Sequence, residues 1–155
     1  MTLAELLELK GVSLVTQLYL NPFINLSYLQ LRSLPPEIGA LTNLTDLDLE
    51  NNQLTALPIQ IGELTSLVCL WARGNRLTDI PDTIENLTEI WPFNDWTGGL
   101  DLSNNLLTVL PPRVLSNFKT DEAGRHFELK ITELLGKGLL KQSGYRLDLS
   151  GNPIQ

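Results

Sequence analysis

Hydrophobic residues recur along the chain with a period of 23 positions. Residues 44–66 read LTDLDLENNQLTALPIQIGELTS, and residues 67–89 read LVCLWARGNRLTDIPDTIENLTE. Both fit the pattern L-x-x-L-x-(L/A)-x-x-N-x-L-T-x-(L/I)-P-x-x-I-x-x-L-T. Equivalent residues occur one period earlier and, after an insertion of seven residues, one period later. A last, partial copy consists of Leu147, Leu149 and Asn152. We therefore count four repeats and a half repeat, which is typical of a solenoid.

Each position of the pattern predicts a structural role. In an L-x-L segment the two leucines point to one face of a strand and the residue between them to the other. Stacked copies predict a parallel sheet with buried leucines. The proline that follows cannot continue a hydrogen-bonded ladder, so it starts a return segment. On that segment, short helical turns are expected to cover the core with Ile38, Ile61, Ile84 and Val114.

An asparagine follows four of the expected strands, at Asn52, Asn75, Asn105 and Asn152. Its amide both donates and accepts, so stacked copies are expected to form a structural ladder that satisfies backbone groups in the turns. Leu29 occupies this position in the first repeat, which weakens the ladder there and is typical of an end unit.

The segments LPPEIGALTNL, LPIQIGELTSL and LDLSNNLLTVLPP resemble the 23-residue leucine-rich repeats of intracellular scaffolds. This class includes Ras-group, Scribble-like and Roco repeat domains, and the resemblance covers roughly residues 24–115 and 145–155. It implies an α/β leucine-rich-repeat solenoid, with a curved parallel sheet on the concave face and short helices or irregular segments on the convex face. Such repeats bind many unrelated partners, so the resemblance says little about function.

We expect one domain with atypical end units. Its parts are an N-terminal cap (residues 1–23), the repeats (24–116, with an insertion at 91–98), an inserted helical segment (117–143) and the last half repeat (144–155).

Two helices and a hairpin are expected outside the repeats. A capping box and helical spacing predict a short helix over residues 2–10, and a hairpin from 15–20 into 23–28 would cap the first repeat. In the second insertion, Phe127, Ile131, Leu134 and Leu135 form a helical apolar stripe. This helix either covers core, which we favour, or is a specialised lobe for a partner.

Composition excludes several classes of function. Eighteen acidic residues against eleven basic ones give a net charge of −7, which argues against nucleic acid and against an anionic membrane surface. No apolar run approaches the roughly 20 residues of a membrane span, and the N-terminus does not read as a secretory signal. A single cysteine, Cys69, allows no internal disulfide, so a cytoplasmic location is expected.

The outward positions of the strands form three rows across the concave face. They are Phe23, Asp46, Cys69, Gly99, Arg146; Asn25, Asp48, Trp71, Asp101, Asp148; and Ser27, Glu50, Arg73, Ser103, Ser150. Tryptophan and arginine are enriched at binding hot spots, which singles out Trp71 and Arg73. The expected partner-binding set is completed by Asp48, Glu50, Asp101 and Tyr28, with loop contacts from Trp91 and Trp96. Alternatively, Trp71 packs under the 91–98 loop.

Catalysis has little support, and we expect no enzyme, no cofactor and no metal site. His126 is the single histidine, and nothing in the sequence activates Cys69. Residues 135–138 lack the spacing of a phosphate-binding loop.

The sequence therefore favours a protein-interaction module that binds a basic or amphipathic segment of another protein on its concave face. One alternative is a regulatory domain of a larger enzyme such as a Roco-like GTPase, and another is a self-associating structural unit. We favour a monomer in which residues 120–142 cover the last strand. A dimer paired along strand 145–150 and a fragment of a longer protein are the alternatives.

Overall fold

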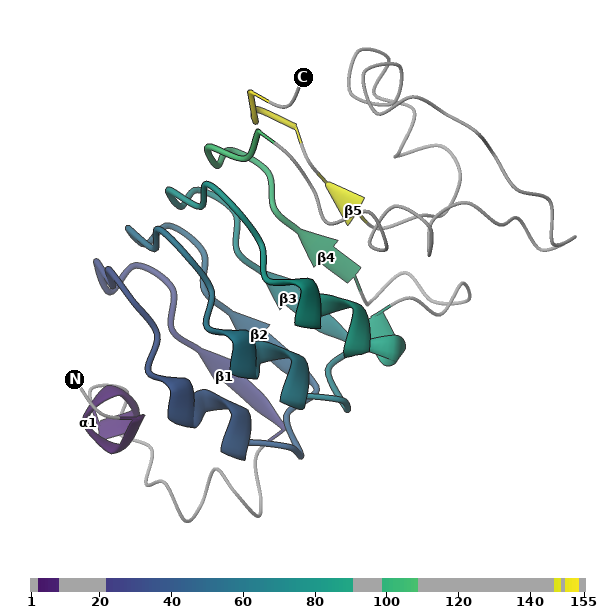
Figure 1. Cartoon of the computed structure of the whole chain (residues 1–155). Helices are drawn as coiled ribbons and strands as arrows, with labels where there is room; N and C mark the ends of the chain where they lie inside the picture. Colours follow the sequence, from purple (N-terminus) through teal and green to yellow (C-terminus); the bar gives the residue numbers. More distant parts are fainter. Residues whose placement is uncertain (1–2, 9–21, 91–98, 109–146, 149, 154–155) are drawn as a thin grey trace, which may run out of the picture.

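Five short parallel strands stack in chain order, β1 to β5, in the computed structural model of this protein (Figure 1). The structure describes residues 3–8, 22–90, 99–108, 147–148 and 150–153, and expectations about other residues lie outside it. Helix α1 precedes the sheet, and the elements are α1 (Leu3–Glu8), β1 (Phe23–Asn25), β2 (Asp46–Asp48), β3 (Cys69–Trp71), β4 (Gly99–Asp101) and β5 (Leu147–Asp148). Sequential order is what tandem repeats dictate, because each unit packs against its neighbours.

The return segments carry 3-10 helices on the other side of the sheet (Figure 1). These are η1 (Pro36–Ala40), η2 (Ile59–Glu63), η3 (Asp82–Asn86) and η4 (Thr88–Ile90). Each of the first three follows a proline in the extended region, at Pro35, Pro58 and Pro81. The proposed role of the prolines and the short helical turns are therefore confirmed.

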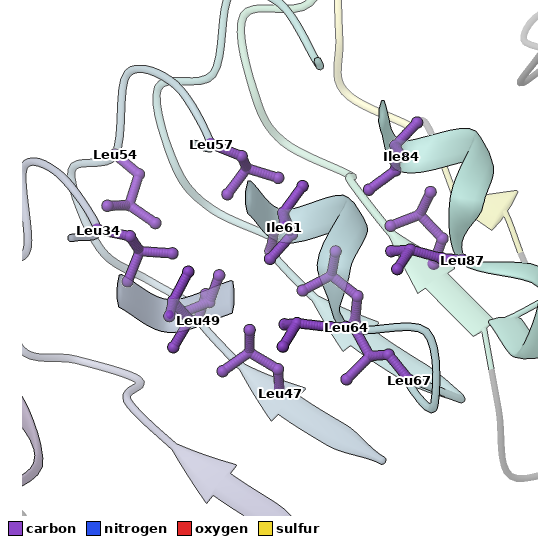
Figure 2. Packing of buried hydrophobic residues seen from close by; sticks show 14 of the residues in the cluster. Leu34, Leu47, Leu49, Leu54, Leu57, Ile61, Leu64, Leu67, Ile84 and Leu87 are labelled. Carbon is purple, nitrogen blue, oxygen red and sulfur yellow. The ribbon is translucent and has the colours of Figure 1, made fainter. Parts of the chain in front are cut away.

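The hydrophobic core fills the space between the strands and the 3-10 helices. Figure 2 shows Leu47 and Leu49 from the second strand unit lying among Ile61 and Leu64 of the following return segment, and all four are 0% exposed. The predicted burial is confirmed for the leucines at 47, 49, 70, 100 and 102 and for Ile38, Ile61 and Ile84. Val114, Leu149 and the side chain of Leu147 lie outside the described part.

Asparagine side chains connect consecutive repeats through their backbones. The Nδ2 of Asn75 donates to the carbonyls of Ala72, in its own repeat, at 3.0 Å and of Leu49, one repeat earlier, at 2.9 Å. Its Oδ1 accepts the Leu54 N–H at 3.1 Å. Asn52, Asn105 and Asn152 likewise receive a backbone N–H of the preceding repeat and donate back to one of its carbonyls.

The first repeat depends on its neighbour for these bonds. Leu29 stands where the other repeats have asparagine, and it is only partly buried. The Oδ1 of Asn52 accepts the N–H groups of both Leu29 and Leu31, each at 3.0 Å. Among the described residues, the asparagine bonds to this turn therefore come from the second repeat.

Glycines let the 3-10 helices pack closely. A β-carbon added to Gly62 of η2 would overlap the Thr83 carbonyl oxygen of η3 and lie 2.6 Å from the Thr83 β-carbon. Gly39 of η1 faces η2 in the same way, because an added β-carbon would lie 2.9 Å from the Gln60 carbonyl oxygen. The third repeat carries Glu85 at this position.

We expect Asn75→Ala to lower the free energy of unfolding by roughly 1–3 kcal/mol, because it strands buried backbone partners in two repeats. Denaturant titration measures the loss. Asn86→Ala, an exposed asparagine at the end of η3, is the control and should change stability by less than about 0.5 kcal/mol. Equal effects for the two variants would contradict the ladder.

Gly62→Ala is expected to destabilise the fold by about 1–3 kcal/mol, because the added methyl group meets backbone that cannot rotate away. Glu85→Ala alters the equivalent position of the next repeat, where a β-carbon is already accommodated, so it should have a much smaller effect. Thermal unfolding followed by circular dichroism compares the two, and an unchanged Gly62→Ala midpoint would contradict the close packing.

Candidate protein-binding face

The parallel register brings the outward residues of successive strands into rows on the concave face. Asn25, Asp48, Trp71, Asp101 and Asp148 are paired from strand to strand, and we call them the central row. A neighbouring row of Phe23, Asp46, Cys69 and Gly99 is paired in the same way. The third row, beyond the strand ends, contains Ser27, Glu50, Arg73, Ser103 and Ser150. Backbone bonds between successive repeats continue alongside the third row, for example from Asn51 N to the Arg73 carbonyl at 2.9 Å.

Trp71 lies at the centre of this face. It is half-buried, and its in-register neighbours on either side are Asp48 and Asp101, both also half-buried. Arg73, two residues further along the chain, is exposed. The structure therefore places Trp71, Arg73, Asp48, Glu50 and Asp101 on adjacent strand units of one face.

Parts of the outward face are closed to solvent. Cys69 is 2% exposed and Ser103 is 1% exposed, although both occupy outward rows. The Cys69 thiol is buried and forms no disulfide, which suits a packing residue better than a nucleophile. An outward position on a strand therefore does not by itself make a side chain accessible. On this face Arg73 is exposed, and its neighbours are half-buried.

The central-row carboxylates also have a structural role that the sequence reasoning missed. The Oδ1 of Asp48 accepts the Glu50 N–H at 2.9 Å. Asp101 accepts the N–H and hydroxyl of Ser103, and Asn25 does the same with Ser27. This is the local turn bonding that Asp and Asn favour, and its signal is the recurring Asx-x-Ser or Asp-x-Glu spacing. Tryptophan at 71 cannot make this bond, so the turn does not explain its presence.

The described outward side chains near Glu50 are mostly acidic. Burial raises the pKa of Glu50 above its ordinary value of 4.5, the nearby Asp48 and Asp101 raise this pKa further, and Arg73 lowers it. Among the described outward side chains, Asp46, Asp48, Glu50 and Asp101 are opposed by one basic residue, Arg73. Such a surface attracts cationic groups.

Tyr28 lies at the edge of this face, in the turn that follows β1, and it is 72% exposed. It is outside the strand rows, although its N–H donates to the Glu50 carbonyl at 3.0 Å. Trp91 and Trp96, the expected loop contacts, lie outside the described residues, as do His126 and residues 135–138.

Other kinds of site find no support in the part of the chain that the structure describes. No three His, Cys, Asp or Glu side chains there are grouped so as to hold a metal ion. Within the same residues, no helix is both long and apolar enough to cross a membrane.

The repeat geometry agrees with what comparison with known proteins finds. The chain matches the family model of the leucine-rich repeat region over residues 3–127, and it belongs to that family. Repeats of this fold commonly serve as protein-interaction modules. The finer resemblance to Ras-group, Scribble-like or Roco domains stays a prediction.

Two solved structures are similar to this chain. A leucine-rich-repeat protein of Leptospira interrogans has 32% sequence identity and a TM-score of 0.58, with 83% of this chain and 31% of that chain covered. The leucine-rich-repeat ectodomain of the receptor kinase SOBIR1 from Arabidopsis thaliana has 24% identity and a TM-score of 0.44, with 79% of this chain and 64% of that chain covered. The present chain thus spans less than two thirds of either protein chain. No curated protein matches.

The pKa of Glu50 gives a prediction for stability against pH. A raised pKa means that the folded protein binds this proton more tightly than the unfolded chain, so the ionised carboxylate lowers the free energy of unfolding at neutral pH. Glu50→Gln should therefore be more stable than wild type at pH 7, by up to about 0.5 kcal/mol in low salt because the site is partly solvated. The gain should vanish as the pH falls through the raised pKa.

Denaturant titrations at pH 7 and at about pH 3.5 measure this difference. Glu37→Gln, which removes an exposed negative charge from η1 on the convex face, controls for net charge. A Glu50→Gln variant less stable than wild type at pH 7 would contradict the repulsion among these carboxylates.

Proposed function

We propose that this domain is a non-catalytic interaction module that binds a basic or amphipathic segment of another protein on its concave face. Trp71 is the central contact, Arg73 lies beside it, and Asp48, Glu50 and Asp101 surround both. A cytoplasmic location belongs to the same proposal, since the single cysteine, Cys69, allows no internal disulfide.

The observation that carries the proposal is the position of Trp71. The other described side chains of the central row, Asn25, Asp48 and Asp101, close their own turns with hydrogen bonds. Trp71 gives up that bond and leaves part of its aromatic ring system exposed between two carboxylates. Tryptophan buries much apolar area at a small loss of rotamer entropy, which is why it is enriched where proteins bind one another.

The charge of the surround supports a cationic partner. Asp48 and Asp101 repel the carboxylate of Glu50, and a bound lysine or arginine would relieve this repulsion. The ring face of Trp71 attracts the same cations through its quadrupole. Aromatic and carboxylate groups therefore favour one class of ligand, while Arg73 selects against segments with uninterrupted positive charge.

A random 12-residue peptide library displayed on phage provides the probe, with the wild-type protein as bait. We expect the selected peptides to contain basic residues. Trp71→Ala should weaken binding of the corresponding synthetic peptide by about 2 kcal/mol or more, roughly 30-fold, and leave the melting temperature almost unchanged. Isothermal titration calorimetry measures the affinity and scanning calorimetry the stability.

Ile59→Ala is the matched control, because it truncates a 64% exposed apolar side chain of η2 on the convex face. It should leave affinity unchanged. If Trp71→Ala instead melts markedly earlier and binds normally per folded molecule, Trp71 is a packing residue. Failure of the library to give any basic peptide would also contradict the proposal.

A further inference from the structure

At one position of the repeat, a tyrosine occupies a backbone conformation in which the other units carry glycine or asparagine. The residue just before the ladder position has a positive φ in all five units: Tyr28 59°, Asn51 53°, Gly74 68°, Asn104 54° and Gly151 73°. Glycine adopts this region freely and asparagine tolerates it, whereas other residues are destabilised there by their β-carbon. Tyr28 is therefore the one residue of this set whose type is unsuited to the conformation, and Gln30, two residues further in the same turn, also has a positive φ of 56°.

The described residues offer the Tyr28 side chain little that would offset this strain. Its side chain is 72% exposed, so burial contributes little. Its N–H donates to the Glu50 carbonyl at 3.0 Å, but Asn51 and Gly74 make the equivalent bonds to Arg73 and Ser103, so the bond does not need a tyrosine. Strained residues kept without a stabilising contact are concentrated at functional sites.

The surroundings of Tyr28 indicate what it contacts. It ends the first strand unit, whose other end carries Phe23, 43% exposed. The next unit presents the carboxylates of Asp48 and Glu50, and the one after that presents Trp71. An exposed tyrosine and the half-exposed Trp71 are thus separated by a strip of negative charge.

We propose that Tyr28 anchors an apolar side chain of the partner segment whose basic residue contacts Trp71, so that the segment crosses the strands diagonally from β3 to the end of β1. This inference rests on the proposed function and narrows the partner to a short extended segment in which a basic and an apolar residue have a set spacing. Trp71 and Tyr28 are separated by two strand spacings across the sheet and by three residues along the strand direction, which is about 10 Å in each direction. The diagonal of about 14 Å corresponds to about four residues of extended chain.

Tyr28→Asn tests the inference, because asparagine is the residue at the equivalent positions 51 and 104. The variant should melt about 2–4 °C higher, since the strain is removed, and should bind the selected peptide at least about fivefold more weakly. A purely structural tyrosine would give the higher melting temperature with unchanged affinity. Peptides selected on this variant should keep the basic residue and lose the apolar residue about four positions away.

Two further variants make the test specific. Tyr28→Phe keeps the ring and the strain, so it should bind within about twofold of wild type; a loss as large as that of Tyr28→Asn would contradict an apolar anchor. Leu106→Asn removes a 51% exposed apolar side chain from the turn of the fourth repeat and should leave affinity unchanged. Equal weakening by Leu106→Asn would show that the effect is not specific to Tyr28, and would overturn the inference.

The outcomes separate the inference from the proposed function. If Tyr28→Asn changes neither affinity nor the selected sequences while Trp71→Ala weakens binding, the inference is wrong and the concave-face function stands. If neither variant weakens binding, both are wrong.

Discussion

The hydrogen bonds of the ladder asparagines are the interaction on which the rest of this structure depends. Each strand is only a few residues long, so the backbone hydrogen bonds between strands give little support on their own. The chain must also turn sharply over buried leucines. The amide of Asn75 solves both problems, since it binds carbonyls of two repeats and accepts an N–H of the earlier one. Repeats thereby stack in one register, and that register decides which outward residues become neighbours.

Stacking separates structural positions from functional ones. Inward positions are restricted to apolar residues by the core, and Gly39 and Gly62 are restricted by the approach of the next 3-10 helix. Outward positions of the strands are less restricted: Asn25, Asp48 and Asp101 form local turn bonds, and Cys69 and Ser103 are buried. A large aromatic residue such as Trp71 can therefore be introduced on the concave face without disturbing the repeat.

Much of the fold follows from the sequence because every repeat states the same pattern. Leu47 and Leu49, the prolines before the 3-10 helices and the asparagines were all predictable from periodicity and side-chain chemistry. The rows of the face followed from the same period. Periodicity could not show that Cys69 and Ser103 are buried at outward positions, or that Tyr28 has a left-handed backbone, because these depend on three-dimensional contacts and dihedral angles.

Departures from the repeat are more informative about binding than its consensus residues. Asp48 and Asp101 have a sufficient structural reason in the bonds they accept, so their presence alone says little about a partner. Trp71 forgoes that bond, and Tyr28 adopts a backbone conformation unsuited to it, so the stability of the repeat explains neither residue. Both are at least partly exposed on adjoining parts of one face, with the carboxylate of Glu50 in the unit between them. The ligand that we propose for this face would account for two such residues lying so close together.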